Sequence, residues 1–396
     1  MNILFLYGGE IRSTRGGVQR VTENLADEFE RRGHKVFYLS KNKEPDAHEI
    51  SPRQHFLPAN DWCAPENRAF LLIFLKENAI DVVINQGGIS PECSRFSYIA
   101  KGAGVPVIGE CHTSILAVPL RFCAIKENAW KKRKMAWLLP VADTRLGKKF
   151  LLALYKRKYG AHFRELCRKS DKVVMLSERY KLELAFYFGT ETAPENVGGV
   201  PNPVPTSSQA VDFSAKKREL LFVGKMENGI KRVDLLLQIW AKLEARFPAW
   251  SLRLVGGGFD IEEIRALAKT LGLRRVFFEG FQKPEKFYRD ASIFCMMSAF
   301  EGFPMALVEA AAFACVPVAF DSFAAVHDII SDGKNGALVP AFDLEKYAET
   351  LARLMSDDAE RERLARAAQR DVARFSVEKI ADRWEQIFNE VCGSSK

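Results

Sequence analysis

Short apolar runs alternate with amphipathic stretches along the whole chain. Residues 2–7 form a continuous apolar run, a glycine-rich turn follows at Gly16 and Gly17, and residues 18–32 carry apolar side chains at helical spacing. Residues 35–39 return to a short apolar run. Since a strand, a helix and a second strand in this order pair in parallel, the pattern predicts a parallel sheet.

The alternation continues and then begins again in the second half of the chain. Further apolar runs of strand length in the first half are residues 82–85, 106–109 and 172–176. Those in the second half are residues 219–223, 251–255, 276–278, 293–297, 316–320 and 337–339. Helix-length segments lie between them. Two successive sets of alternating strands and helices predict an α/β protein with two doubly wound, Rossmann-like domains.

A stretch rich in Pro, Gly, Asn and Ser, residues 193–208, separates the two sets and lacks apolar periodicity. We therefore expect the linker near residues 201–205, with a first domain over residues 1–200 and a second over residues 201–376. A last helical pattern, at about residues 377–391, is expected to pack back on the first domain together with the residues up to 396.

The bulk composition excludes several classes of protein. Of 396 residues, 47% are hydrophobic and 27% are charged, which suits a globular protein with two cores. No apolar run approaches the roughly 18 residues of a membrane span, and the apolar start lacks the basic lead-in of a signal peptide. The eight cysteines are scattered, without the spacing of a zinc site. We expect a cytoplasmic protein with no metal site.

The net charge of +8 comes entirely from the first half. Residues 1–200 contain 31 Lys and Arg against 22 Asp and Glu, a balance of +9, which leaves −1 for the rest. Residues 126–158 alone hold 11 basic and two acidic residues, interleaved with aromatic ones. Such a segment favours an anionic bilayer surface. A solvated helix face is the alternative, and no nucleic-acid motif accompanies the segment.

Ligands of open parallel sheets bind beyond the carboxyl ends of the strands, so residues that follow a strand are candidates for a site. Gly17 opens the first helix, where backbone N–H groups suit a phosphate, although a tight turn without a ligand has the same sequence. His112 follows the run at residues 106–109 and is either catalytic or a core histidine. Lys225 and Lys231 flank the exit of the first strand in the second domain. Because a basic helix start is unfavourable without an anion, they either neutralise a diphosphate or form a solvated turn.

The segment from Glu301 to Glu309 combines an acid, a Gly-Phe-Pro turn and a second acid inside an apolar helix. A buried carboxylate is costly unless it is paired, and the vicinal hydroxyls of a sugar or ribose would pair with it. A salt bridge from Glu309 to a Lys or Arg is the alternative. Free N–H groups at the helix start suit a phosphate. The residues around that start are Phe303, Pro304, Met305 and Ala306.

With these residues in place, the chain resembles family 4 of the retaining glycosyltransferases, which have the GT-B fold of two Rossmann-like domains that face across a cleft. The resemblance covers nearly the whole chain. Its most specific motif is the pair of glutamates eight positions apart, Glu301 and Glu309. The other motifs are Arg15-Gly16-Gly17-Val18-Gln19, Gly224-Lys225 with Lys231, the glycines at 256–258, Glu279-Gly280-Phe281 and Ser331-Asp332-Gly333-Lys334-Asn335-Gly336.

The resemblance implies a role for each candidate. Glu301 would contact hydroxyls of the transferred sugar and Glu309 those of the ribose. Lys225 and Lys231 would bind the diphosphate, with Gly17 close to it. His112 would lie beside the transferred sugar. The implied donor site also includes Gly280, Phe303, Pro304, Met305 and Ala306, and the implied acceptor contacts are Gln19 and Arg15.

The implied substrates are a nucleotide sugar, with UDP favoured and GDP possible, and a hydroxyl of a glycan or lipid-linked acceptor in surface-polysaccharide synthesis. The reaction would need no metal, cofactor or protein nucleophile. Two residues depart from the family pattern. Lys225 stands where Arg is common, so a point charge replaces a fork, and Pro203 stiffens a linker that usually reads Asn-Gly. A GT-B sugar-nucleotide epimerase and a non-catalytic nucleotide- or glycan-binding module are the rival hypotheses.

Overall fold

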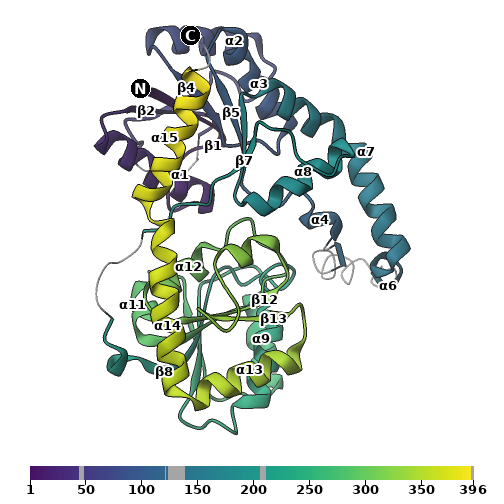
Figure 1. Cartoon of the computed structure of the whole chain (residues 1–396), viewed down its shortest axis with the longest axis vertical. Coiled ribbons are helices and arrows are strands. Elements are labelled where there is room, and N and C mark those ends of the chain that lie inside the picture. Colours follow the sequence, from purple (N-terminus) through teal and green to yellow (C-terminus); the bar gives the residue numbers. More distant parts are fainter. Residues whose placement is uncertain (44–48, 121, 124–138, 206–210, 394–396) are drawn as a thin grey trace. The chain divides into compact units, whose positions relative to one another are not determined.

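The computed structural model describes residues 1–43, 49–120, 122–123, 139–205 and 211–393 (Figure 1). These residues form two compact units. The first comprises residues 1–116, 152–205 and 375–396, and the second comprises residues 117–151 and 206–374. Each unit contains one parallel sheet with helices on both faces.

The first unit is built on a seven-stranded parallel sheet with the strand order β3-β2-β1-β4-β5-β6-β7. Its strands are β1 (Asn2–Gly9), β2 (Lys35–Asn42), β3 (Gln54–Phe56), β4 (Val82–Asn85), β5 (Val107–Cys111), β6 (Lys172–Met175) and β7 (Val197–Gly199). Its helices are α1 (Gly17–Arg31), α2 (Pro65–Glu77), α3 (Pro91–Gly102), α8 (Lys181–Phe188), α15 (Val377–Gly393) and the later turns of α7 (Arg145–Lys169). Because every pairing is parallel, all strand exits lie on one edge.

The central strand β1 is apolar on both faces because helices cover both. Leu4 and Leu6 lie in one core with Phe74 of α2. Phe5 points to the opposite face, where its ring centroid lies 6.5 Å from that of Phe29 in α1. A sheet buried on both faces explains why its strands read as continuous apolar runs rather than as alternating ones.

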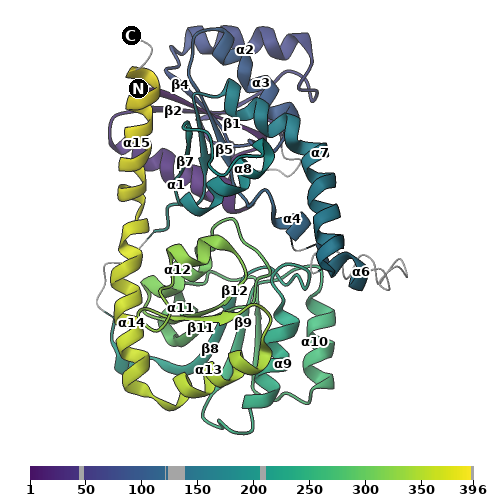
Figure 2. The ribbon, with the colours of Figure 1, turned by 45° about the vertical axis from the view of Figure 1, so that its right-hand side comes forward.

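The C-terminal helix α15 packs against α1 within the first unit (Figures 1 and 2). Trp384 and Phe388 of α15 are buried, and the ring of Phe388 lies 5.4 Å from that of Phe29. The last helix of the chain therefore completes the core of the unit that contains the first strand.

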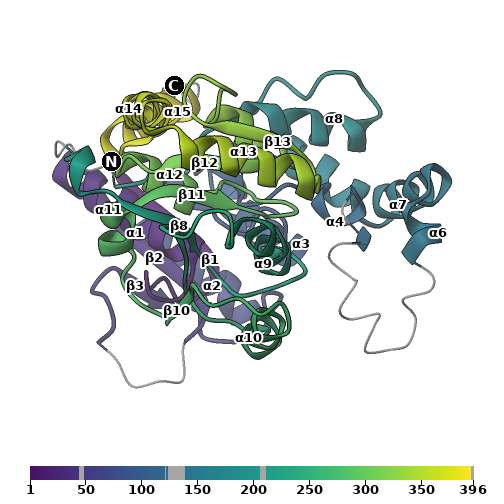
Figure 3. The same ribbon diagram turned by 90° about the horizontal axis from the view of Figure 1, so that it is seen from below.

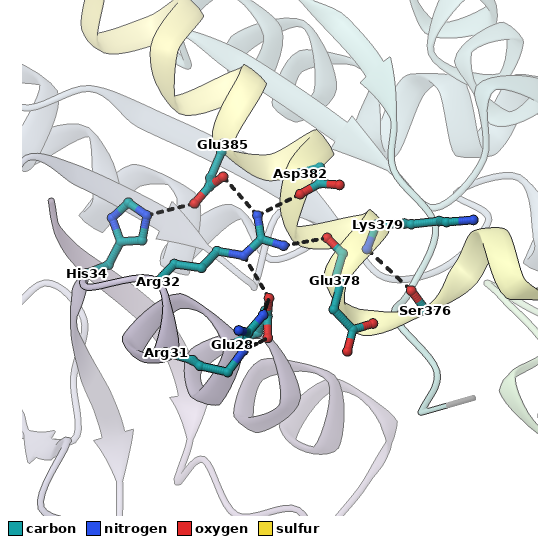
Figure 4. Close-up of polar contacts among 9 residues, drawn as sticks. All are labelled: Glu28, Arg31, Arg32, His34, Ser376, Glu378, Lys379, Asp382 and Glu385. Atoms are coloured by element: carbon teal, nitrogen blue, oxygen red, sulfur yellow. Dashed lines mark hydrogen bonds and ion pairs between the residues drawn. The ribbon is translucent and has the colours of Figure 1, made fainter. Parts of the chain in front are cut away.

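Arg32, at the end of α1, joins the two helices through polar contacts (Figure 4). Its guanidinium donates to Glu28 at 2.7 Å and to the main-chain carbonyl of Glu378 at 2.8 Å. It also donates to Asp382 at 2.7 Å and to Glu385 at 2.9 Å, both on α15. One planar guanidinium thus satisfies acceptors on both helices, a geometry that a lysine ammonium cannot reproduce.

The second unit is built on a six-stranded parallel sheet with the order β10-β9-β8-β11-β12-β13. Its strands are β8 (Lys217–Val223), β9 (Ser251–Val255), β10 (Val276–Gly280), β11 (Ala291–Met296), β12 (Val316–Asp321) and β13 (Ala337–Pro340). Its helices include α4 (Ala117–Leu120), α6 (Leu139–Asp143), α9 (Val233–Leu243), α10 (Ile261–Thr270), α11 (Glu285–Asp290), α12 (Met305–Ala312), α13 (Leu344–Ser356) and α14 (Asp358–Val372). The first turns of α7 also fall within its residues.

Helices cover both faces of this second sheet as well. Trp240 of α9 and Tyr347 of α13 share a core with Leu254 and Val318 of the sheet. On the other face, α14 contacts α12. Figure 2 shows the sheet between α9 and α10 on one side and α12 and α14 on the other. In Figure 3 the helices α9, α10 and α14 are seen nearly end-on, so their axes run in similar directions.

The predicted fold class is confirmed, because both halves contain parallel sheets built from the expected apolar runs. The apolar pattern does not predict β3 and β7, which have only three residues each. β7 lies inside the segment expected to be linker, and two of its three residues are glycine, so it carries no periodic signal. The division also differs from the expected one. Residues 201–205 belong with the first unit, and residues 117–151 belong with the second.

We expect Arg32→Met to loosen α15 from α1. The change removes hydrogen bonds to three carboxylates, of which Asp382 is mostly exposed, and exposed ion pairs contribute about 1 kcal/mol or less each. The free energy that protects the amides of α15 in hydrogen exchange should therefore fall by about 2 kcal/mol. Arg32→Lys keeps the charge without the fork and should give an intermediate loss. Protection of α15 that is equal in Arg32→Met and wild type would contradict this account.

The same contact should depend on pH. Hydrogen bonds from His34 and from Arg32 hold the pKa of Glu385 below its usual range. A carboxyl with a lowered pKa stabilises the fold above its usual pKa, and the contribution is lost as the pH falls through the lowered value. Exchange protection of α15 should accordingly decline on acidification, and the decline should be smaller in Glu385→Gln.

Candidate functional site

The exits of three neighbouring strands in the second unit are packed together through glycine. The N–H of Gly256, after β9, donates to the carbonyl of Gly280 at 2.7 Å, and the N–H of Met226 donates to that of Gly257 at 2.9 Å. Gly256 has a φ of 131°, and a Cβ there would lie 2.0 Å from the carbonyl oxygen of Gly224. Only glycine fits this position. The turn at 256–258 therefore sets how closely β8, β9 and β10 approach one another.

Lys225 and Lys231 lie at the exit of β8 and just before α9. The Lys225 side chain is exposed and, within the part of the chain that the structure describes, forms no ion pair. Lys231 passes close to Gly224, since a Cβ on that glycine would lie 3.9 Å from the Lys231 Cε. The Nζ of Lys231 lies 2.5 Å from Oε1 of Glu301. The structure thus brings together a lysine and a glutamate that the sequence separates by 70 positions.

Acids of the same unit compensate the basic start of α9. Glu301 pairs with Lys231, and Asp234 pairs with Arg232 at 3.0 Å. An unfavourable charge at a helix start is therefore a weaker argument for a bound anion than the sequence suggests. Lys225 has no such acid among the described residues, so it is the cation best placed to meet a ligand.

Glu301 is held from two sides at the exit of β11. Its side chain is 13% exposed, and Oε1 accepts from Ser298 Oγ at 2.7 Å as well as from Lys231. The carbonyl of Ser298 in turn accepts from Ser322 Oγ, after β12, at 2.6 Å. Two serines at neighbouring strand exits therefore orient this carboxylate, and the sequence reasoning did not single out either one.

Glu309 lies on α12 with a partner that differs from the expected ones. The hydroxyl of Tyr288 donates to Glu309 Oε2 at 2.8 Å. The helix around it is buried, but Glu309 itself is only half-buried. An uncharged donor at the end of α11 thus satisfies part of the carboxylate, where the sequence suggested a cation or a ribose.

The start of α12 offers fewer N–H groups than the sequence suggests. Pro304 is the N-cap and has no N–H. The N–H of Met305 donates to the carbonyl of Phe303 at 2.9 Å, and that of Leu307 donates to the carbonyl of Pro304 at 3.0 Å. Among the described backbone atoms, the N–H of Ala306 has no acceptor. This amide, with no acid in the first turn of the helix, is the group best suited to a phosphate.

The candidates of the first unit lie at one edge of its sheet. His112 follows β5, and its Nε2 lies 2.8 Å from Oε1 of Gln86, which follows β4. Gly17 begins α1 and is exposed. A Cβ there would meet no atom within 4 Å, so this unit by itself does not require glycine at the position. Arg15 and Gln19 flank it on the same turn. Their roles toward an acceptor stay predictions, as does the role of His112.

Several residues at strand exits were missed by the sequence reasoning. They are Gln86 after β4, Ser298 after β11, Ser322 after β12, and the exposed Asp321 and His327, whose side chains are hydrogen-bonded at 2.8 Å. The rule that functional residues follow parallel strands would have found them. Each has a side chain too common in loops to attract attention by type alone.

Comparison with known proteins matches both halves of the chain. Residues 15–208 match Glycosyltransferase Family 4, and residues 204–371 match Glycosyl transferases group 1. The chain belongs to glycosyltransferase family 4. The resemblance read from the sequence is therefore confirmed.

Several similar proteins are glycosyltransferases by name. The amylovoran biosynthesis glycosyltransferase AmsD of Erwinia amylovora is 29% identical over 56% of this chain, and the lipopolysaccharide 1,6-galactosyltransferase of Salmonella typhimurium is 26% identical over 48%. The matched segments span 62% and 54% of those two proteins, so the chain covers less than two thirds of either.

Solved structures of other proteins share the whole fold. The lipopolysaccharide outer core galactosyltransferase WaaB superposes with a TM-score of 0.68 at 22% identity, covering 100% of both chains. Anabaena HepE, solved in complex with UDP and glucose, has a TM-score of 0.68 at 16% identity, covering 98% of this chain and 99% of its own. The two parallel-sheet domains are therefore those of the GT-B fold.

No metal site stands out where the chain is described. Over residues 1–43, 49–120, 122–123, 139–205 and 211–393, no three His, Cys, Asp or Glu residues are grouped so that they could hold a metal ion. Metal independence stays a prediction.

Gly256→Ala should strongly destabilise the carboxyl edge of the second sheet. The new Cβ would meet the Gly224 carbonyl oxygen at 2.0 Å in a backbone conformation that alanine rarely adopts. Overpacking costs about 1–3 kcal/mol and a strained backbone about 1–3 kcal/mol more. We therefore expect a loss of about 3 kcal/mol in the free energy of unfolding, measured by chemical denaturation.

The neighbouring glycine provides a matched control. A Cβ on Gly257 would meet no atom within 4 Å, so Gly257→Ala should leave the free energy of unfolding almost unchanged. Equal stability of the two variants would show that the close approach of β9 to β8 does not require glycine at position 256.

Proposed function

We propose that the protein is a glycosyltransferase that moves a sugar from a nucleotide sugar to a hydroxyl of a glycan or lipid-linked acceptor in surface-polysaccharide synthesis. Family membership supports the reaction class. The observation that carries the proposal is the group of charged side chains at the carboxyl edge of the second sheet. There the exposed Lys225 follows Gly224, the glycine that Lys231 approaches, and Lys231 forms an ion pair with Glu301.

The donor is proposed to lie along this edge. A diphosphate needs cations, and Lys225 and Lys231 supply two, with the amide of Ala306 as a further donor. A sugar needs hydrogen-bond acceptors, and Glu301 offers carboxylate oxygens beside the Lys231 ammonium. One ion pair thus presents a cation to the phosphate and an acceptor to the sugar. Glu309, half-buried on α12, is proposed to accept from the ribose hydroxyls.

The nucleobase is proposed to stack on an exposed aromatic ring at the same edge. Phe281, directly after Gly280, is 90% exposed. Every base has a π-face that stacks on such a ring. Stacking does not distinguish uracil from guanine. We favour UDP because HepE and Staphylococcus aureus TarM were solved with UDP.

The proposed reaction retains the configuration of the anomeric carbon. The acceptor oxygen forms a bond to that carbon on the face from which the nucleotide leaves, and the bond between carbon and phosphate oxygen breaks. The departing phosphate oxygen takes the proton of the acceptor hydroxyl. Cations near the diphosphate stabilise this leaving group, so no protein nucleophile and no metal are required. His112 is proposed to lie beside the sugar, and Arg15 and Gln19 on the acceptor side.

Binding of nucleotide diphosphates tests the donor site. We expect Lys225→Ala and Lys231→Ala each to weaken the affinity for UDP by about tenfold, or about 1.4 kcal/mol, as measured by calorimetry. The effect of Lys231→Ala should be the larger, because it leaves the Glu301 carboxylate facing the phosphate without its partner. Glu309→Gln should also weaken binding, whereas Tyr288→Phe, which removes only the neighbouring hydroxyl, should change it little.

Lys242→Ala is the matched control. This lysine lies on the last turn of α9 and pairs with Glu345, so its loss should leave the affinity for UDP unchanged. The donor site would be refuted if wild-type protein bound neither UDP nor GDP. It would also be refuted if Lys225→Ala bound both as tightly as wild type.

We propose that the acceptor is membrane-borne because α7 exposes a stripe of apolar side chains. Leu146, Phe150 and Leu154 recur every four residues and therefore form one stripe along the helix. Their side chains are 79%, 69% and 48% exposed. The exposed Lys149 and Lys158 lie next to this stripe. An apolar stripe bordered by cations suits the surface of an anionic bilayer, with the apolar side chains inserted and the ammonium groups at the phosphates.

The proposed location of the protein follows from the same helix. None of the helices in the described part of the chain is both long and apolar enough to span a bilayer. We propose a cytoplasmic protein that docks peripherally through residues 126–158. The basic cluster Lys131, Lys132, Arg133 and Lys134 belongs to this segment by sequence, but it lies outside the described residues.

Vesicle co-sedimentation tests the docking surface. Changing Leu146, Phe150 and Leu154 together to Ser should weaken binding to phosphatidylglycerol vesicles at least tenfold, because burial of each side chain contributes about 1.5 kcal/mol or more. Changing Lys149 and Lys158 to Ser should weaken binding only when the lipid is anionic. Leu182→Ser is a control, since Leu182 is 64% exposed on α8. Unchanged sedimentation of the triple variant, or self-association through the stripe, would contradict the proposal.

A further inference from the structure

The imidazole of His112 lies in a buried polar cluster at the carboxyl edge of the first sheet. Its Nε2 lies 2.8 Å from Oε1 of Gln86 and 3.5 Å from Oε2 of Glu110. The hydroxyl of Thr22, on α1, lies 3.0 Å from the same Gln86 oxygen. Gln86, directly after β4, and Glu110 of β5 therefore face one ring nitrogen, and Thr22 of α1 contacts the same Gln86 oxygen.

This cluster is unusual because it is buried and only partly satisfied. Thr22, Gln86 and Glu110 are 0%, 3% and 2% exposed, and the side chain of His112 is 9% exposed. Within the described residues, the Nδ1 of His112, the Oε2 of Glu110 and the Nε2 of Gln86 have no hydrogen-bond partner. Burial of such groups is costly, so their presence needs an explanation other than stability.

The partners of Nε2 determine where the imidazole carries its proton. A carboxylate can only accept hydrogen bonds, and Glu110 lies on the Nε2 side of the ring. The Gln86 carbonyl oxygen, the closer neighbour, also accepts. The Glu110 carboxylate therefore favours a hydrogen on Nε2, which the Gln86 carbonyl oxygen accepts, and this leaves Nδ1 with a lone pair in the neutral ring.

The main chain after His112 is fixed independently. Glu183 on α8 accepts from Ser114 Oγ at 2.7 Å and from the N–H groups of Ile115 and Leu116 at 2.6 and 3.1 Å. This contact holds the loop but does not reach the imidazole. The orientation of the ring and its tautomer therefore depend on Gln86 and Glu110.

We propose that Gln86 and Glu110 are positioning residues that hold His112 as the Nε2–H tautomer and present its Nδ1 as an acceptor to a substrate hydroxyl. The proposal rests on the proposed transferase function only for the identity of that hydroxyl. The Thr22 hydroxyl, which carries one hydrogen, lies between two acceptors, the Gln86 oxygen at 3.0 Å and the carbonyl of Val18 at 2.9 Å. The same amide thus ties His112 to the first turns of α1, where Arg15, Gly17 and Gln19 lie.

The test is the tautomer of His112, read from ring ¹⁵N–¹H correlation spectra at alkaline pH, where imidazoles are neutral. The chain has six histidines, and the signal missing in His112→Gln identifies the right one. Wild type should show the Nε2–H pattern. Gln86→Leu removes the nearer acceptor and should shift the ring toward a mixture of tautomers, whereas Gln86→Glu keeps an acceptor and should preserve the Nε2–H form.

Kinetics distinguish positioning from mere support of the fold. Gln86→Leu and Glu110→Gln should lower kcat about tenfold, while the affinity for UDP, whose proposed contacts lie in the other unit, stays unchanged. Gln86→Glu should restore most of the kcat. Thr22→Val, which deletes only the hydroxyl beside Gln86, provides a milder change that carries the test if Gln86→Leu does not fold.

Two results would overturn the proposal. One is an Nδ1–H pattern in the wild-type protein, and the other is an unchanged tautomer together with an unchanged kcat in Gln86→Leu. A protein without transferase turnover would refute the proposed function instead, because the spectra report the tautomer whether or not a sugar is transferred.

Discussion

Parallel strand pairing is the constraint on which both units depend. Every neighbouring pair of described strands in the two sheets is parallel, so each sheet gathers its strand exits on a single edge. Side chains far apart in sequence then meet there, as Lys231 meets Glu301 and Gln86 meets His112. The glycines at 256–258 let the exits of β8, β9 and β10 approach one another closely.

The charges at the second edge are organised as pairs rather than as a basic patch. Lys231 is neutralised by Glu301, whose oxygen also accepts from Ser298, while Lys225, after β8, is exposed. An ion pair that is partly buried is weak evidence for stability. It does orient a cation and an acceptor side by side, which matches a substrate that carries phosphate and sugar hydroxyls together.

The sequence predicted the architecture well because a sheet covered on both faces produces continuous apolar runs. It failed for β7, where two glycines leave no pattern. The sequence also placed Lys225, Lys231, Glu301 and His112 near strand exits, where the structure has them, and their roles stay predictions. The sequence pattern could not predict contacts between side chains. Nothing in the sequence pairs Lys231 with Glu301 across 70 positions, supplies Tyr288 as a partner of Glu309, or sets Glu110 and Gln86 around one imidazole.

The central claim is that this protein transfers a sugar from a nucleotide sugar to a separate acceptor. Incubation of the purified protein with UDP- and GDP-sugars, with and without a bacterial lipid extract, tests it most directly. The account predicts that free nucleoside diphosphate appears only when the extract is present, and that the sugar becomes bound to an extract component with its anomeric configuration retained. Release of free sugar without the extract, or no release with any donor, would contradict it.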